Sequence, residues 1–172
     1  IELDDKLIIA KNLLGTTYKN MGHYDKAMEI FTTVLKQAEL IGDKRGLGDS
    51  LNNIGIVYWN KGNNDKALDY YSRSLSVCRE LGDKYDMGVR LNNIGIVYAN
   101  KGDYDKALDF LKRSLAIKEE LGSKYGIGNS LNNIGNVYFN KGDIDTGLNY
   151  FTRSLAIKEE LGDKHGIGYS LN

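Results

Sequence analysis

The sequence of 172 residues has no proline, a single cysteine and only two histidines. Cys78 has no partner for a disulfide within the chain, and its neighbours Leu75 and Leu81 place it on an apolar helical stripe. We therefore predict a buried core cysteine and a reducing location such as the cytoplasm. His23 and His165 stand near opposite ends of the chain without metal-ligand spacing, so the sequence predicts no metal site.

The chain also lacks an excess of charge of either sign. Lysine plus arginine number 23, as do aspartate plus glutamate, so the formal net charge is zero. Surfaces for nucleic acid or for anionic membranes are usually basic, so we expect neither partner. No apolar run approaches the roughly 18 residues that a membrane span needs. Nucleophile, phosphate-loop and calcium-loop motifs are missing as well, and we expect neither an enzyme nor a cofactor site.

What the sequence does contain is a repeat of forty residues. The pattern Leu-Asn-Asn-Ile-Gly occupies positions 51–55, 91–95 and 131–135, begins again at 171–172, and has a degenerate copy at 12–15. All twenty glycines except Gly147 fall at recurring positions of this repeat. A fixed period between about twenty and fifty residues is typical of a solenoid, in which each unit buries its apolar face against its neighbours.

One repeat, residues 83–122, has the pattern of two antiparallel helices. Asp83 is a good N-cap for a first helix that ends near Asn100, and Gly102 supplies its stop. Asp103 can cap a second helix, which Gly122 ends. The equivalent positions are Asp43, Ser123 and Asp163 for the first cap, Gly22, Gly62 and Gly142 for the first stop, and Gly42, Gly82 and Gly162 for the second.

A glycine inside the first helix predicts a close helix crossing. Gly95 costs about 1 kcal/mol relative to alanine in a helix interior, yet glycine returns at positions 15, 55 and 135. We expect a bulky side chain of the second helix to cross there, and the candidates are Tyr71, Leu111 and Phe151. Ala107, with Ala27 and Ala67, would permit the approach. Gly147 replaces this alanine in the fourth repeat and is expected to loosen the packing.

Pairs of glycines near the start of the first helix resemble short phosphate loops. They are Gly46 with Gly48, Gly126 with Gly128, and Gly166 with Gly168. A dinucleotide fingerprint needs a preceding strand and a third glycine, and the chain has neither. We therefore predict a packing role, in which these small residues let a first helix approach the preceding second helix.

These motifs together resemble the tetratricopeptide repeat (TPR) family. The family pattern is roughly W-x2-L-G-x2-Y followed by A-x3-F and a proline, and the third copy here gives Leu91-x2-Ile94-Gly95-x2-Tyr98 and then Ala107-x3-Leu111. The period is forty rather than about 34 and the proline is missing, which is similar to the long repeats of kinesin light chains and cell-polarity adaptors. The resemblance implies an all-α, right-handed superhelical solenoid of antiparallel helix pairs. We expect one domain over 1–172, with repeats at about 3–42, 43–82, 83–122 and 123–162 and a partial fifth repeat at 163–172.

The resemblance also implies that the first helices line a concave groove. By register from the shared glycine, the groove residues are Asn12, Asn52, Asn53, Ile56, Trp59, Asn92, Asn93, Ile96, Asn132, Asn133, Asn136 and Phe139, with Thr16, Lys19 and Asn20 in the first repeat and Ala99 in the third. Asparagine is a mediocre helix former, but its amide pairs with both groups of a peptide bond. We therefore predict an asparagine ladder that holds an extended peptide, with Trp59 and Phe139 as apolar contacts. The alternative is structural, above all for Asn20, Asn60, Asn100 and Asn140, which can help to end a helix.

We thus expect a protein-interaction scaffold that binds a protein or peptide ligand in this groove. Groove lysines that would bind chaperone C-terminal tails are missing, since asparagine stands at positions 12, 52, 92 and 132. A regulatory or sensor module within a larger signalling protein is one alternative. End-to-end self-association is another, because Ile167 and Leu171 would leave an apolar edge without a polar cap.

Overall fold

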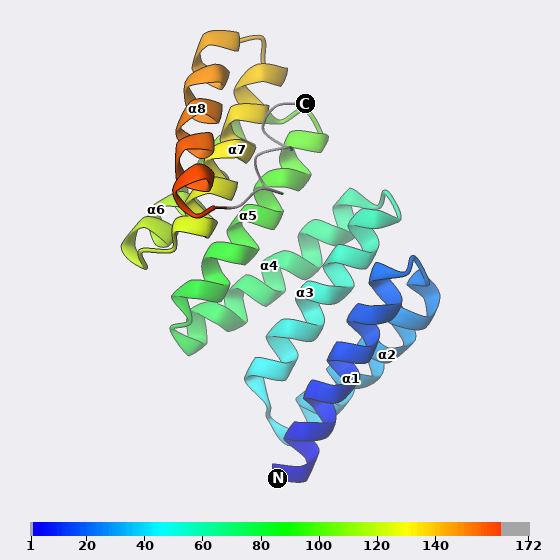
Figure 1. Cartoon of the computed structure of the whole chain (residues 1–172). Helices are drawn as coiled ribbons and strands as arrows, with labels where there is room; N and C mark the ends of the chain where they lie inside the picture. The colour runs from blue at the N-terminus through cyan, green and yellow to red at the C-terminus, as the bar shows by residue number, and fades with distance from the viewer. Residues whose placement is uncertain (1, 163–172) are drawn as a thin grey trace. The chain divides into compact units, whose positions relative to one another are not determined.

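The computed structural model describes residues 2–162, which form helices joined by short turns (Figure 1). This part of the chain contains no strand. The fold is the expected all-α, TPR-like solenoid class built of antiparallel helix pairs. The helices are α1 (Glu2–Asn20), α2 (Tyr24–Ile41), α3 (Lys44–Asn60), α4 (Asn64–Leu81), α5 (Lys84–Asn100), α6 (Tyr104–Glu120), α7 (Lys124–Asn140) and α8 (Ile144–Glu160).

The chain divides into two compact units, Ile1–Asp86 and Met87–Asn172. The first unit contains α1 to α4, and the second contains α6 to α8 with nearly all of α5. Each helix pair falls within one of the four complete repeats expected from the sequence. The single domain over 1–172 stays a prediction, and the partial fifth repeat lies outside the described residues.

Glycine ends the helices as predicted. Eight glycines that follow helices have positive φ, between 64° and 89°, and they include the predicted stops Gly102 and Gly122. This left-handed conformation suits glycine because it has no Cβ. The amide of Gly102 donates to the carbonyl of Ala99 at 3.0 Å, which satisfies one free end of α5.

Aspartate caps the helix starts, but serine does not. The carboxylate of Asp83 accepts from the Asp86 amide at 3.0 Å, and Asp103 accepts from the Lys106 amide at 3.3 Å. The side chain of Ser123 makes no cap hydrogen bond, so that expectation is wrong. The Ile127 amide still donates to the Ser123 carbonyl at 2.8 Å, as the Leu47 amide does to the Asp43 carbonyl at 2.9 Å. Asp163 lies outside the described residues.

The mid-helix glycines mark the predicted crossings. A Cβ atom at Gly55 would lie 2.7 Å from the ring of Tyr71, and one at Gly95 would lie 2.7 Å from Leu111 Cγ. Phe31 and Phe151 fill the same place against Gly15 and Gly135. Ala27, Ala67 and Ala107 are fully buried beside these crossings. Packing of the two helices in each pair therefore depends on a glycine facing a large side chain.

Gly147 stands where the other repeats have alanine. A Cβ atom there would lie 3.1 Å from the carbonyl oxygen of Gly135 and 3.2 Å from the amide nitrogen of Phe139. A Cβ atom at Gly135 would lie 3.2 Å from the Gly147 carbonyl oxygen, the same distance that separates a Cβ atom at Gly95 from the Ala107 carbonyl oxygen in the third repeat. The two backbones therefore approach equally in both repeats, and the expected loosening at Gly147 stays a prediction.

The paired glycines face two different neighbours. A Cβ at Gly126 would meet Lys118 Cδ of the preceding helix α6 at 3.0 Å, as predicted. The second glycine of each pair instead faces the second helix of its own repeat: Cβ atoms at Gly48 and Gly88 would each lie 3.3 Å from Val77 and Ile117 respectively. The prediction is wrong for this position. Gly166 and Gly168 lie outside the described residues.

A buried serine explains the closeness at the second glycine. The hydroxyl of Ser74 donates to the Gly48 carbonyl at 2.7 Å, and Ser114 and Ser154 make the same bond, also at 2.7 Å, to the carbonyls of Gly88 and Gly128. All three serines are fully buried. Each bond joins the two helices of one repeat and leaves no polar atom of the hydroxyl unsatisfied.

The remaining expectations concern the cysteine and the two histidines. Cys78 is buried and forms no disulfide among the described residues, as predicted. His23 is exposed at the start of α2, where its ring lies edge-on to Tyr18 with centroids 6.1 Å apart. His165 lies outside the described residues.

Candidate functional site

The first helix of each pair carries the predicted groove residues, and in the second unit they surround a hollow. This hollow has a volume of about 240 Å³ and lies between α5 and α7 over the side chain of Leu111 in α6. It brings together the predicted residues Ile96, Asn133 and Asn136. The full lining is Ile96, Ala99, Asn100, Leu111, Asn133, Asn136, Val137 and Asn140.

Several of the asparagines are committed to the protein itself. The Nδ2 group of Asn133 donates to Oδ1 of Asn92 at 3.0 Å, which links α7 to α5. Asn52, Asn93 and Asn132 also interact with other groups of the protein. Asn52 is buried, with only 8% of its surface exposed. These side chains interact within the protein, which agrees with the alternative that such asparagines stabilise the repeat.

Other asparagines keep their amides available. Asn136 is exposed, and its side chain makes no hydrogen bond to any residue in the described part of the chain. The same is true of Asn100 and Asn140, the last residues of α5 and α7. Backbone groups of the following glycine turns make the helix-ending bonds instead. Three uncommitted amides therefore border the hollow, which has no charged side chain in its lining.

The first unit presents different groups at the equivalent positions. Oδ1 of Asn12 accepts from the Ser50 hydroxyl at 3.4 Å, a long and weak bond. Ile56, Trp59 and Asn53 are half-buried on α3. Lys19 near the end of α1 is half-buried, and this burial lowers the pKa of its amine from the ordinary value. In the second unit Phe139, at the position of Trp59, is 52% exposed.

The sequence missed two residues that form the floor of the hollow. Leu111 and Val137 are buried and line it from below. Leu111 had been predicted to cross Gly95, and this crossing places it at the base of the space between α5 and α7. The signal was therefore present in the glycine spacing, although it indicated packing rather than a site.

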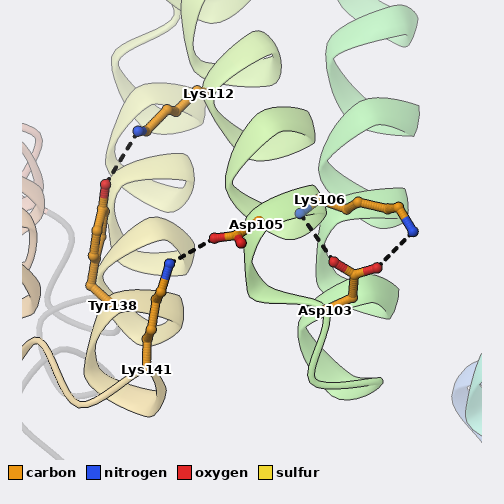
Figure 2. A network of polar contacts seen from close by, with 6 residues as sticks. All are labelled: Asp103, Asp105, Lys106, Lys112, Tyr138 and Lys141. Carbon is orange, nitrogen blue, oxygen red and sulfur yellow. Dashed lines mark hydrogen bonds and ion pairs between the residues drawn. The ribbon is translucent and has the colours of Figure 1, made fainter.

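Polar contacts in the second unit link α6 to the end of α7 (Figure 2). Lys141 pairs with Asp105 at 2.6 Å, and the hydrogen bond to Asp105 is the main cause that raises the pKa of Lys141. Lys106 pairs with Asp103 at 2.7 Å, and its hydrogen bond is the main cause that lowers the pKa of that carboxyl. Lys61 and Asp25 make the equivalent inter-repeat pair in the first unit at 2.8 Å. Each charge is paired, which suits a structural link rather than acid–base chemistry.

Among the described residues, no cluster of three or more histidine, cysteine, aspartate or glutamate side chains has the arrangement of a metal site. Within residues 2–162, none of the helices has both the length and the apolar character needed to cross a membrane.

Comparison with known proteins decides the family. Sequence models of the tetratricopeptide repeat match residues 9–39, 47–120 and 128–166, which together cover most of the chain. The chain belongs to the tetratricopeptide repeat family. TPR repeat proteins are in general non-catalytic scaffolds, and the match supports a TPR module for protein interaction or regulation. Comparison with curated protein sequences finds no significant match.

Solved structures share this TPR fold at low sequence identity. A Rap protein complexed with competence and sporulation factor is 18% identical with a TM-score of 0.87, over 95% of this chain and 46% of that one. A signal transduction ATPase with a TPR sensor from Pyrococcus horikoshii is 17% identical with a TM-score of 0.84, over 95% and 25%. Kinesin light chain TPR-like repeats from Podosopora anserina are 14% identical with a TM-score of 0.76, over 99% and 87%. The chain thus spans less than half the length of the Rap protein and of the ATPase. The likeness to the Podosopora anserina repeats confirms the expected resemblance to kinesin light chains.

Proposed function

We propose that this TPR module binds an extended peptide of a partner protein along its first helices. The observation that carries the proposal is the hollow of the second unit, where the free amides of Asn100, Asn136 and Asn140 lie beside the apolar Ile96 and Ala99. An amide can donate to a peptide carbonyl and accept from a peptide N–H, so these groups suit a backbone in any sequence. The apolar surface next to them suits a ligand side chain.

The asparagines divide into two roles under this proposal. Asn92 and Asn133 bond to each other and hold α5 against α7, so they position the groove. Asn136 and Asn140 contact the ligand. In the first unit Asn12, Asn53, Ile56 and Trp59 supply the corresponding contacts, and Phe139 adds an apolar contact in the second. Asn52, Asn93 and Asn132 stay predicted groove residues that also interact within the protein.

Selection from a random-sequence peptide library tests the proposal. The double variant Asn136→Ala, Asn140→Ala removes two free amides without breaking any hydrogen bond of the described structure. Peptides selected on the unchanged protein should bind this variant at least about tenfold more weakly, since each lost hydrogen bond contributes about 1 kcal/mol. Asn149→Ala, an exposed change on α8, is the matched control and should keep affinity. Equal binding by both variants would refute the proposed site.

A regulatory or signalling role is a second candidate, favoured by the proteins with the same fold. One of them is a signal transduction ATPase whose TPR repeats are a sensor, and this chain spans 25% of its length. Here the module would control an adjoining domain when its ligand binds. A full-length gene product with a catalytic or effector domain beside residues 1–172 would support this candidate, and a product made of repeats alone would count against it.

Self-association is a weaker candidate that rests on the outer face of α1. Leu14 is 49% exposed there, whereas the equivalent Ile54 in α3 is 1% exposed. Met21 stands where Lys61 and Lys141 pair with the preceding repeat, so a contact at this face would be apolar. A rise of mean mass with concentration in light scattering, reversed by Leu14→Glu, would support it. The predicted cytoplasmic location rests on the single cysteine of the sequence, Cys78, and microscopy of the tagged full-length protein tests it.

A further inference from the structure

In every repeat after the first, a tyrosine of the first helix stacks on an aromatic ring of the second helix. The stacked pairs, with the distances between their ring centroids, are Tyr58 and Tyr70 at 5.4 Å, Tyr98 and Phe110 at 5.6 Å, and Tyr138 and Tyr150 at 5.5 Å. An arginine three residues further along the second helix lies over the second ring, 5.2 to 5.3 Å from its centroid: Arg73, Arg113 and Arg153. Each tyrosine of the first helix therefore packs against an aromatic ring that has a cation beside it.

The first repeat keeps only the tyrosine of this arrangement. Tyr18 is present and half-buried, but Ile30 and Thr33 stand at the positions of the second ring and of the arginine. A hollow of about 390 Å³ lies beside Tyr18, between α1 and α2. Its lining is Lys11, Leu14, Tyr18, Lys26, Glu29, Ile30 and Thr33. Small-molecule sites have volumes of about 300 to 1,000 Å³, so the space can hold one aromatic ring with a short side chain.

A carboxylate at the edge of this hollow lacks the cation that its counterparts have. In the second and third repeats an aspartate pairs with the arginine four residues later, Asp69 with Arg73 at 3.8 Å and Asp109 with Arg113 at 3.1 Å. The first repeat has Glu29 at the aspartate position, and the hydroxyl of Thr33 donates to the Glu29 backbone carbonyl at 2.9 Å. The Glu29 carboxylate makes no hydrogen bond or ion pair with any residue among 2–162.

The two lysines in the lining leave room for another positive charge. The Lys26 amine lies over the Tyr18 ring, 5.4 Å from its centroid. In the second and third repeats the equivalent lysines, Lys66 and Lys106, lie over their tyrosines at 5.0 and 5.3 Å although each repeat also holds its arginine. The other lysine, Lys11, donates to Gln37 at 3.1 Å. The repeat frame thus accommodates a lysine and a second cation around one aromatic stack.

We propose that the hollow beside Tyr18 binds a small aromatic cation, meaning one aromatic ring that carries an ammonium or guanidinium group. The ring would stack on Tyr18 as Tyr70 stacks on Tyr58, and the cation would pair with Glu29. Stacking and a charge pair each add to the affinity. The site is independent of peptide binding, because Lys11, Leu14 and Tyr18 differ from the α1 residues that the register assigns to the groove.

Titration of the full-length gene product with 2-phenylethylammonium, followed by NMR signals of the ligand, tests the proposal. Two further probes each keep one half of the proposed ligand: 2-phenylethanol has the ring without the charge, and 2-cyclohexylethylammonium has the charge without the aromatic ring. Each should bind at least about twofold more weakly than 2-phenylethylammonium. Equal affinities for all three probes would overturn the proposal, as would a failure of 2-phenylethylammonium to bind because a second copy or a neighbouring repeat covers the hollow.

Two variants locate the binding. The double variant Ile30→Tyr, Thr33→Arg restores the ring and the cation of the other repeats, so it should fill the hollow and abolish binding. Glu29→Gln should weaken 2-phenylethylammonium by about two- to fivefold and leave 2-phenylethanol unchanged. Glu39→Gln, the same loss of charge at an exposed place on α2, is the control and should change neither. Binding that survives in the double variant, or that Glu29→Gln leaves unchanged, would overturn the site.

Discussion

The two compact units use the same forty-residue frame but place different groups at one buried position. In the first unit this position holds Ala38 and Cys78, both buried and uncharged. In the second it holds Lys118, which donates to the Ser130 hydroxyl at 2.8 Å, and Lys158, which is 4% exposed and also has partners. The backbone geometry at this position therefore does not require an apolar residue. A polar side chain is accommodated there when its polar group can form a hydrogen bond with a neighbour.

At the groove positions the charged residue lies in the first unit instead of the second. The first unit carries the charge, on Lys19, whereas the lining of the hollow in the second unit is uncharged. Substitutions four residues after the repeat glycine change the charge of this surface, whereas substitutions at the buried position are expected to change stability. This distinction gives the variants below their expected order of effect.

The largest expected effect is at the shared glycine crossing, where the two units should behave alike. Gly55→Val in the first unit and Gly135→Val in the second would each force a side chain into an aromatic ring already 2.7 Å from a Cβ atom. Overpacking of this kind costs about 3 kcal/mol or more, beyond any gain in helix propensity. Chemical denaturation measures the loss of unfolding free energy.

Gly48→Ala provides the control for that pair, because its Cβ would lie 3.3 Å from Val77, which is tight but tolerable. We expect a change within about 1 kcal/mol, since the gain in helix propensity offsets the contact. If Gly55→Val were as stable as the unchanged protein, the crossings would not be what holds the helix pairs together.

A smaller effect, confined to the second unit, is expected for Lys118→Met. Burial lowers the pKa of Lys118 from 10.5 to about 8, so the folded protein disfavours the protonated amine. The penalty is complete below pH 8, declines as pH rises because the unfolded state holds the proton longer, and is gone above 10.5. The variant should therefore be more stable than the unchanged protein at pH 7, and the difference should shrink toward pH 10.5.

Chemical denaturation of the unchanged protein and of Lys118→Met at pH 7 and at pH 10.5 measures this difference in stability. Lys36→Met is the control at an exposed position of the first unit. Comparing protein and variant at each pH cancels the titration of tyrosines. A stability difference that stays constant with pH would mean that Lys118 is charged and well solvated in the folded chain.

Most of the fold could be predicted because its signals are local and repeated. Gly102 and Gly122 stop helices by backbone conformation alone, and Gly95 indicated that Leu111 would cross it. The serine-to-glycine bonds were not predictable, since Ser114 and Gly88 are 26 residues apart and neither has a distinctive local pattern.

The candidate site could be predicted as a surface but not as a set of roles. Register from the repeat glycine placed Ile96, Asn133 and Asn136 together, and the structure finds all three around one hollow. Which asparagine bonds to its neighbour depends on the spacing of α5 and α7, whose residues Asn92 and Asn133 are 41 positions apart. That distance follows from packing in three dimensions and leaves no trace in composition.

The asparagine pair gives a moderate effect that should differ between the units. Asn92→Ala and Asn133→Ala each remove the 3.0 Å amide bond of the second unit and should cost about 1 kcal/mol. The double variant should cost less than the sum, because both changes remove the same bond. Asn53→Ala, at the equivalent place in the first unit, removes a side chain without a hydrogen bond in the described structure and should cost less. Additive losses at 92 and 133 would show that the bond does not stabilise the fold.

The smallest effect is expected at the exposed ion pairs, which both units share. Lys61→Met and Lys141→Met each break a pair at the surface, with Asp25 and Asp105 as the partners. Exposed pairs contribute little because water screens them and long side chains lose freedom to form them. Thermal unfolding should therefore be nearly unchanged, whereas NMR should show the pKa of Asp25 returning upward, since the hydrogen bond from Lys61 is the main cause that lowers it. A clear loss of thermal stability in either variant would mean that these pairs fasten neighbouring repeats, and the glycine crossings would no longer account alone for the shared frame.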